Sequence, residues 1–375
     1  MIPFNRPYFP EETLEFLGNA VKSRFSKGDG TYTEAASDLI SKLSGGGDVL
    51  MTPSCTHALE MAVLLLDLNP GDEVIMPSYT FTSAATSLVH FGVTPVFVDI
   101  DAQTKNIDCE EISRAITPKT RAISFLNYAG VGADFLKLRN LAKEYEVALI
   151  EDNAHGLGGT RDGQILGSVG DLATLSFHES KNFQCGEGGA LVINNPIYSD
   201  RARILREKGT NRSQFIKGEV QKYQWVDKGS SYLLSDILAS ILLPQLVRFK
   251  EIQDNRMNTW SLYEENLSDW ALNNGAQLQY VPENSNHTAH MFYIEFESER
   301  IRARVITELH SNGINSVFHY QALHNSPAGR KYGQSSGVYK NTYKAESTLL
   351  RIPLFFGMNP TEITRVVDGL LEIKL

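Results

Sequence analysis

Short apolar runs alternate with amphipathic stretches between about residues 48 and 195. The runs 48–54, 71–78 and 147–153 are rich in consecutive hydrophobic residues, which is typical of strands buried on both faces of a sheet. The stretches 56–68 and 134–146 space their apolar residues at helical intervals. Alternating strands and helices predict an α/β fold with a mainly parallel sheet covered by helices on both faces.

The pattern changes after residue 196. A polar stretch with little periodicity follows a predicted helix at 197–209, and a long helical region spans roughly 232–268. The remaining predicted elements are strands at 290–296 and 315–323 and helices at 299–310 and 361–373. We therefore predict a large α/β domain over residues 1–245 and a smaller α+β domain over residues 246–375.

Composition narrows the class of protein. The chain has 375 residues, of which 42% are hydrophobic and 21% charged, and its net charge is -9. These values are typical of a folded globular protein, and the absence of a long basic block argues against a nucleic-acid scaffold. The apolar run 233–247 is interrupted by Ser235, Asp236 and Pro244, so it is a poor membrane span. We expect a soluble cytoplasmic protein.

The three cysteines, Cys55, Cys109 and Cys185, are far apart and form no CxxC pair. They therefore predict neither a disulfide framework nor a zinc knuckle. His287 and His290 form an HxxH pair, but no third ligand stands at a suitable spacing, and we expect no metal.

Three features with possible chemistry stand at the ends of predicted strands. Ser54, Cys55 and Thr56 lie where a strand passes into a helix, which suits either a phosphate or a plain helix cap. Asp152 ends another predicted strand, where a carboxylate either pairs with a cationic group of a ligand or keeps a loop soluble. Lys181 follows a third strand and precedes the glycine-rich run 186–189. Any one of them alone is commonly a structural or solvated residue.

Taken together, these features match the needs of pyridoxal phosphate. A lysine forms a Schiff base with its aldehyde, an acid pairs with its ring nitrogen, and a helix N-terminus holds its phosphate. The glycines of "GEGG" would let the backbone turn tightly behind the lysine.

The same motifs resemble those of the pyridoxal phosphate-dependent nucleotide-sugar aminotransferases of the DegT/DnrJ/StrS family, whose fold is type I of the aspartate aminotransferase superfamily. The resemblance runs in order over the chain through "GDEVIMPSYTFTSAA", "VFVDID", "IEDNAHG", "SFHESKN", "GEGGALV" and "FHYQALHNSPAG". The stretches "PSCTHALEMA", "REKGTNRSQF" and "GSSYLLSD" look most like the branch that makes dTDP-4-amino-4,6-dideoxygalactose.

The resemblance implies a role for each matching residue. Lys181 becomes the Schiff-base lysine that also moves the proton, and Asp152 becomes the partner of the ring nitrogen. His155 stands where many members have glutamine, near the phenolic oxygen of the ring. Phe81 would stack on the cofactor, the alternative being a core aromatic. The remaining implied cofactor contacts, to the phosphate, are Cys55, Thr56 and Ser176.

Other positions depart from the family pattern or match it only in the region of the substrate. Many members supply a phosphate ligand from the neighbouring subunit within G-x-N-Y-R, where this chain has "GSSYL", so Ser231 replaces the asparagine. The resemblance implies a homodimer with the 209–231 loop at its interface. The candidate substrate or phosphate contacts are Tyr128, Asn211, Arg212, His319 and His324.

The implied activity is transfer of an amino group from L-glutamate, through pyridoxamine phosphate, to C4 of a dTDP-4-keto-6-deoxyhexose. Amination at C3 and formation of the gluco epimer remain open, because no motif reports how the sugar is oriented. Related sugar dehydratases replace the lysine with histidine, which Lys181 argues against. A regulatory or nucleotide-binding protein on the same scaffold, with Lys181 incidental, is the alternative from another class.

Overall fold

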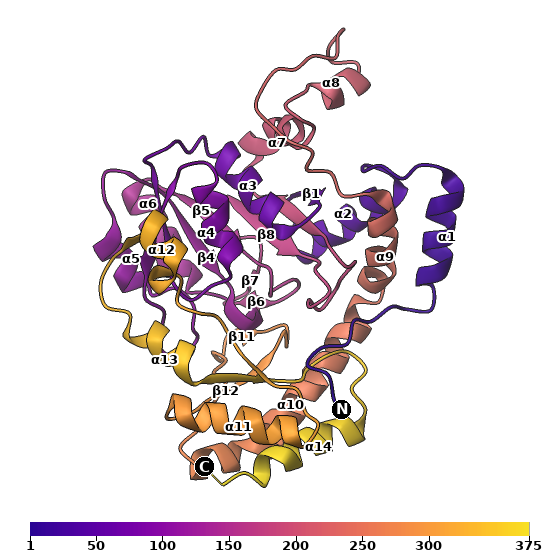
Figure 1. Cartoon of the computed structure of the whole chain (residues 1–375). Coiled ribbons are helices and arrows are strands. Elements are labelled where there is room, and N and C mark those ends of the chain that lie inside the picture. The colour runs from indigo at the N-terminus through magenta and orange to yellow at the C-terminus, as the bar shows by residue number, and fades with distance from the viewer. Residues whose placement is uncertain (375) are drawn as a thin grey trace.

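A twisted eight-stranded sheet forms the centre of the larger part of the molecule in the computed structural model, which describes residues 1–374 (Figure 1). Its strand order is β1-β9-β8-β5-β4-β2-β3-β14, and β9 alone runs in the direction opposite to the other strands. The strands are β1 (Asp48–Thr52), β2 (Glu73–Pro77), β3 (Thr94–Val98), β4 (Thr120–Leu126), β5 (Ala148–Asp152), β8 (Leu172–Ser176), β9 (Gly189–Ile193) and β14 (Gln334–Ser335).

Helices cover both faces of this sheet because alternate side chains of each strand point to opposite faces. In β2, Val74 and Met76 pack into one core cluster, whereas Ile75 packs into another on the opposite face. The covering helices are α2 (Thr31–Leu43), α3 (Cys55–Leu65), α4 (Thr82–Val89), α5 (Cys109–Ala115), α6 (Phe135–Tyr145), α7 (Ser199–Arg206) and α9 (Asp236–Val247). The predicted α/β fold with a mainly parallel sheet is confirmed.

A second, antiparallel sheet of order β10-β12-β15-β13 lies below the first in Figure 1. Its strands are β10 (Gln277–Leu278), β12 (Phe292–Glu295), β13 (Val317–Phe318) and β15 (Leu349–Ile352). Helices α10 (Phe249–Asn273), α11 (Glu299–Ser311) and α14 (Pro360–Leu371) bury their apolar faces against it, and α13 (Lys340–Thr348) leads into β15. The long helical region of the sequence is two helices, since Arg248 between α9 and α10 departs from helical geometry.

The division at residue 245 stays a prediction. β14, which follows α12 (Pro327–Tyr332), pairs with β3 at the edge of the large sheet, so the chain returns to the first layer after building the second. The smaller elements are α1 (Thr13–Ser23), the 3-10 turns at 128–130, 196–198 and 323–325, and a small sheet of β6 (Thr160–Arg161), β7 (Gln164–Ile165) and β11 (Ser285–Asn286).

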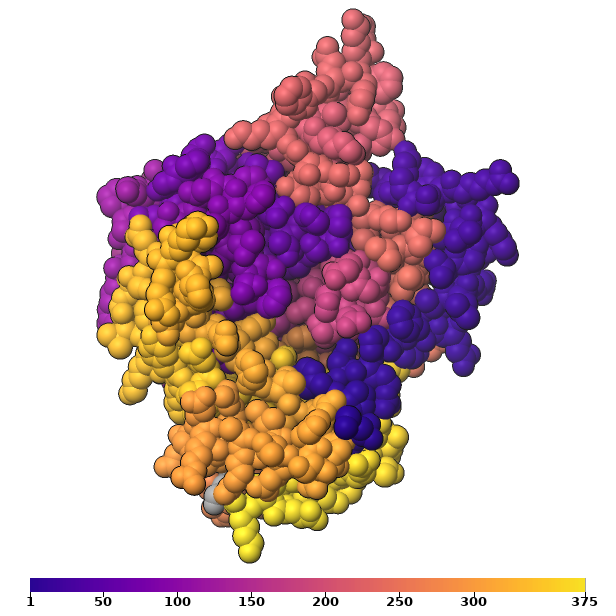
Figure 2. Space-filling view, in the orientation of Figure 1, coloured from indigo at the N-terminus to yellow at the C-terminus, as the bar shows by residue number. Residues whose placement is uncertain are grey.

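The polar 209–231 segment forms an arm that projects from the large domain (Figures 1 and 2). It contains only one short helix, α8 (Arg212–Ile216). Trp225 and Tyr223 of the arm are 81% and 53% exposed, unusual for large aromatic side chains on a free surface. No helix within residues 1–374 is long and apolar enough to cross a bilayer.

Glu151 and Asp152 end β5 as adjacent carboxylates with opposite tasks. Glu151 is fully buried, and its carboxylate accepts hydrogen bonds from the backbone N–H groups of Gly167 (2.6 Å), Val169 (2.9 Å) and Gly170 (3.1 Å). The amide of Asn127 donates a fourth bond at 2.8 Å. Glu151 therefore fixes the loop that leads into β8, and the alternation of the strand directs Asp152 to the other face.

We expect Glu151→Ala to destabilise the fold by about 3 kcal/mol, because it leaves several buried backbone N–H groups without an acceptor. Urea unfolding followed by tryptophan fluorescence measures the loss. Glu144→Ala, at an exposed site on α6, is the matched control and should change stability by less than about 0.5 kcal/mol. Equal stabilities for the two variants would show that Glu151 does not hold this loop.

Candidate active site

A cleft of about 840 Å³ opens between the carboxyl ends of the parallel strands and the second sheet. Parallel α/β sheets bind ligands at this edge because the strand-to-helix loops gather there. From the large domain it is lined by residues that follow β1, β2, β5 and β8, and from the small domain by residues on and around β13 and β15. Of the predicted site residues, Cys55, Thr56, Phe81, Asp152, His155, Ser176, Lys181 and His319 line it.

The N-terminus of α3 supplies a seat for an anion. Ser54 is the N-cap, and its hydroxyl accepts a hydrogen bond from His57 N at 3.2 Å. The backbone N–H groups of Cys55 and Thr56 belong to the first turn, which has no acceptors within the helix. Ser176, at the end of β8, lines the same cleft. Backbone donors and hydroxyls at a helix N-terminus are the elements of a phosphate site.

The glycine-rich run 186–189 allows both a tight turn and a close approach between β9 and α3. Gly186 has a φ of 81°, a turn conformation that side chains disfavour. A Cβ on Gly189 would lie 2.4 Å from the backbone nitrogen of Cys55, so only glycine lets β9 pass against the start of α3. The run therefore serves the anion seat as well as the turn behind the lysine.

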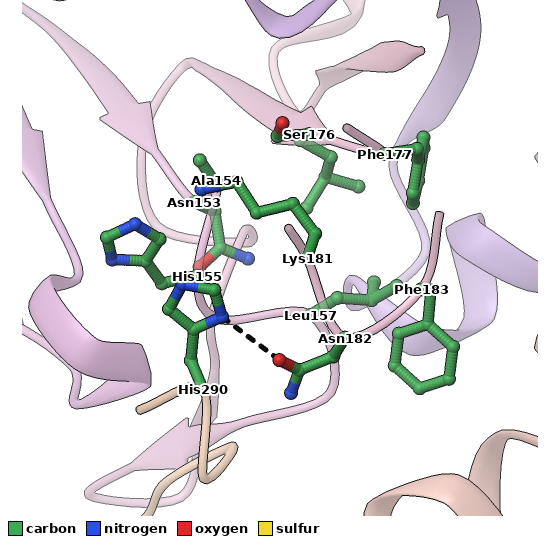
Figure 3. A pocket seen from close by; sticks show the side chains of 11 residues that line it. Asn153, Ala154, His155, Leu157, Ser176, Phe177, Lys181, Asn182, Phe183 and His290 are labelled. Carbon is green, nitrogen blue, oxygen red and sulfur yellow. Dashed lines mark hydrogen bonds between the residues drawn. The ribbon is translucent and has the colours of Figure 1, made fainter. Parts of the chain in front are cut away.

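Lys181 extends its amine into the cleft between Ser176 and Asn153 (Figure 3). Burial lowers the pKa of Lys181 to about 8, and the carboxylate of Asp152 opposes that shift. Burial likewise raises the pKa of Asp152, against the effects of its hydrogen bond from Ala154 N and of Lys181. The lysine and the acid thus face one cleft, and each favours the charged form of the other.

His155 is buried beside Lys181, and its Nδ1 has no hydrogen-bond partner within the described chain. Its ring stacks on that of His290 with centroids 4.2 Å apart, and Nδ1 of His290 lies 3.0 Å from Oδ1 of Asn182 (Figure 3). Burial, and then the charge of Lys181, hold the pKa of His155 well below its ordinary value. A neutral imidazole with a free ring nitrogen can bond to a ligand oxygen.

Phe81 precedes α4 and is 57% exposed on the wall of the cleft, with Tyr320 at 6.3 Å between ring centroids. It is not part of the core in this chain. An exposed aromatic face in a cleft suits contact with a flat ligand ring.

Two predicted substrate residues are engaged inside the protein. Tyr128 is fully buried, and its hydroxyl lies 2.8 Å from Nδ1 of His319, so it supports a cleft residue from behind. His324 lies 2.6 Å from the hydroxyl of Ser78 and 2.9 Å from that of Tyr343. Neither side chain lines the cleft.

The predicted residues of the arm also lie outside the cleft of this chain. Asn211 bonds to Lys222 O at 3.2 Å and to Gln224 N at 2.7 Å, which closes the base of the arm. Arg212 forms an ion pair with Glu207 at 3.0 Å. The exposed Ser231 forms an isolated antiparallel β-bridge with Glu207. Their roles in ligand binding stay predictions.

Sequence reasoning missed two cleft residues, His290 and Arg351. His290 belongs to an HxxH pair, which we considered only as a possible metal site. In the structure its ring stacks on that of His155. Arg351 interrupts the hydrophobic strand "LLRIPL", and an arginine in such a run was a usable signal. Its place in the cleft depends on how the second sheet docks onto the first.

These groups fit pyridoxal phosphate. The amine of Lys181, the carboxylate of Asp152, the unpaired Nδ1 of His155 and the donors at the start of α3 are arranged around one cavity. Each matches a different part of the cofactor: the aldehyde, the ring nitrogen, the phenolic oxygen and the phosphate.

The chain belongs to the DegT/DnrJ/EryC1/StrS aminotransferase family, which matches residues 8–371. It is similar to the aminotransferase TlmJ from Streptoalloteichus hindustanus, with 27% identity, a TM-score of 0.89 and coverage of 99% of this chain and 98% of that one. A putative sugar aminotransferase, Spr1654 from Streptococcus pneumoniae in its PMP-form, shares 26% identity with a TM-score of 0.90, covering 99% and 98% of the two chains. It is also known in a PLP-form. DesI, solved with its TDP-sugar product, shares 26% identity with a TM-score of 0.88, covering 99% and 92%.

The amine of Lys181 should titrate near pH 8 in the cofactor-free protein, because burial disfavours its charged form. Its rate of acetylation against pH, followed by mass spectrometry of the Lys181 peptide, gives the midpoint. Asp152→Asn should move that midpoint lower, since the carboxylate favours the ammonium form. Asp162→Asn, at an exposed turn, is the control and should leave it unchanged. A midpoint near the ordinary lysine value of about 10.4 would contradict the prediction.

Proposed function

We propose that this protein is a pyridoxal phosphate-dependent nucleotide-sugar aminotransferase. It transfers the amino group of L-glutamate to C4 of a dTDP-4-keto-6-deoxyhexose and so forms dTDP-4-amino-4,6-dideoxygalactose. The observation that carries the proposal is the half-buried Lys181, whose amine faces Asp152 in a cleft that also holds an anion seat. The family and its structural relatives support the aminotransferase reaction.

The residues of the cleft divide the work among themselves. Bound pyridoxal phosphate supplies an electron sink for the carbon that loses or gains the amine. Lys181 would hold the cofactor and, once released from it, carry the proton; a pKa of about 8 gives its amine a much larger neutral, basic fraction near neutral pH than an ordinary lysine has. Asp152 would keep the ring nitrogen protonated. His155 would orient the phenolic oxygen, and Phe81 would shield one ring face from water.

The nucleotide sugar is supported by the size of the cleft and by a relative. A cavity of about 840 Å³ is within the range of sites that enclose sizeable ligands. DesI, similar over nearly the whole chain, is known with a TDP-sugar product. The choice of C4 and of the galacto epimer rests on the sequence motifs, with the gluco epimer and C3 as alternatives. A dehydratase is disfavoured, because that chemistry uses histidine where this chain has Lys181.

We include a homodimer with shared active sites in the proposal. The projecting arm exposes Phe215, Tyr223 and Trp225, which are costly to leave in water and suit an interface. Ser231 at its base could then reach the phosphate seat of a neighbouring copy, which it does not approach in its own chain.

The first test is a visible spectrum of the enzyme with pyridoxal phosphate, before and after L-glutamate. The cofactor band should collapse with glutamate, and adding dTDP-4-keto-6-deoxyglucose should restore it. Lys181→Ala should slow both steps by about 10²- to 10⁴-fold, because it removes the group that moves the proton. Lys143→Ala, at an exposed site on α6, is the control.

NMR of the sugar product then reads the position and orientation of the new amine. A galacto-configured 4-amine is the expected result. A gluco product or a 3-amine would replace the proposed substrate specificity and keep the aminotransferase. A wild-type protein that binds no cofactor would overturn the enzyme and leave the regulatory alternative.

A further inference from the structure

A buried ion pair joins the large domain to the second sheet. Nζ of Lys105, in the loop after β3, lies 2.8 Å from Oε2 of Glu295, the last residue of β12, and both side chains are 3% exposed. In β12, Phe292 and Ile294 pack into the core of the small domain, whereas Tyr293 packs against the large domain. Because side chains alternate along a strand, Glu295 shares the face of Tyr293, and that face meets the large domain.

The loop that carries Lys105 is held in one conformation. The carboxylate of Asp101 accepts hydrogen bonds from the backbone N–H of Thr104 at 2.7 Å and from its hydroxyl at 2.8 Å. Lys105 itself has a φ of 62°, in the left-handed region that residues other than glycine seldom adopt. Its amine also donates to the carbonyl of Ala102. The loop therefore presents this amine to Glu295 in a defined orientation.

The ion pair gives direction to an interface that is otherwise largely apolar and aromatic. Tyr128, Tyr293 and Leu349 are among the side chains packed there. Burial of apolar surface has no preferred direction, and apolar residues at positions 105 and 295 would avoid taking two charges out of water. A hydrogen-bonded ion pair, in contrast, is satisfied at only one relative position of its two partners. The pair is therefore better suited to fixing the docking of the domains than to adding stability.

Strand pairing couples Glu295 to the wall of the cleft. Glu295 lies opposite Leu349 on β15. Two residues further along that strand, a distance of about 7 Å, Arg351 lines the cleft. A displacement of Glu295 relative to the large domain would therefore move this part of the cleft wall with it.

Asn106 connects the loop of Lys105 to the same wall. Its side-chain carbonyl accepts a hydrogen bond from the backbone N–H of Tyr128 at 2.8 Å. The hydroxyl of Tyr128 lies 2.8 Å from Nδ1 of His319, which lines the cleft from the small domain. The loop after β3 thus supports the wall both through the ion pair and through Tyr128.

We propose that Lys105 and Glu295 are positioning residues that fix where the second sheet docks and so set the shape of the substrate side of the cleft. The inference rests on the proposed aminotransferase function, because that function defines the substrate side. Lys181 and Asp152, which would hold the cofactor, both belong to the large domain. A change in docking therefore displaces the substrate wall and leaves these cofactor residues in place.

Lys344 does not take over the role of Lys105. Its Nζ lies 3.7 Å from Oε2 of Glu295, but its side chain is 49% exposed. Lys344 belongs to α13, which leads into β15, so its contact with Glu295 stays within the small domain. It can offset the charge of Glu295 without fixing the small domain to the large one.

The double variant Lys105→Met/Glu295→Leu tests the inference in the holoenzyme, because it fills the site without burying charge. Its melting temperature should fall by no more than about 3 °C, since apolar replacement of a buried ion pair is commonly neutral or stabilising. Its KM for dTDP-4-keto-6-deoxyglucose should rise about 10-fold, with kcat changed by less than about 2-fold, because substrate binding is weakened and the cofactor site is unaltered. The absorbance of bound pyridoxal phosphate should match the wild type.

Amide hydrogen exchange followed by mass spectrometry reports the docking without any substrate. Peptides covering residues 315–321 and 349–352 should exchange faster in the double variant, whereas a peptide covering β8 should match the wild type. Lys250→Met/Asp254→Leu removes an exposed ion pair on α10 by the same substitutions, and this control should change neither exchange nor KM. Glu295→Gln keeps the shape of the side chain and should show the same changes as the double variant, so it decides the test if the double variant does not fold.

Three results would overturn the inference. They are wild-type exchange in the cleft peptides of the folded variant, faster exchange with a wild-type KM, and a loss of kcat without a change in KM. Failure of the proposed function looks different, because the wild type itself would then give no product from the sugar. Hydrogen exchange would in that case still decide whether the ion pair fixes the docking of the two domains.

Discussion

The active site depends on one electrostatic constraint: Lys181 is held where burial disfavours its charged form, and the carboxylate of Asp152 offsets only part of that cost. This balance leaves the pKa of Lys181 at about 8. The pairing of strands in the large sheet determines where Asp152 and Lys181 lie relative to each other. Asp152 on β5 is paired in register with Thr174 on β8, and Lys181 follows the end of β8.

At the end of β5, one carboxylate stabilises the fold and the adjacent one faces the cleft. Glu151 and Asp152 are neighbours, and the two-residue period of the strand directs them to opposite faces. Glu151 is saturated by three backbone N–H groups and an amide, whereas Asp152 accepts one bond from Ala154 N. A shift of one residue in the register of β5 would exchange these roles, so the loop that Glu151 anchors also fixes which carboxylate faces Lys181.

The sequence predicted those site residues whose positions follow from the end of a strand or the start of a helix. Asp152 and Lys181 end or follow buried strands, and Cys55 and Thr56 start a capped helix, so the topology of a parallel sheet brings them together. His290 and Arg351 come from the second domain, and no local pattern reports how that domain docks. Tyr128 and His324 show the converse case, since polar aromatic residues in a motif can be engaged by the core, and their roles in substrate binding stay predictions. The roles of the arm residues in ligand binding stay predictions, because a single sequence does not describe contacts between chains.

The N-terminal segment joins the two sides of the cleft. Ile2 exchanges backbone hydrogen bonds with Gly313 and Asn315 of the small domain at 2.7 and 3.0 Å. Phe4 then covers the guanidinium of Arg351, and the amide of Asn5 donates to Glu179 O at 3.0 Å, two residues before Lys181. One short extended segment thus contacts both Arg351 and the loop that carries Lys181. Their separation is constrained by this segment as well as by domain docking, so the first five residues help to set the geometry of the cleft.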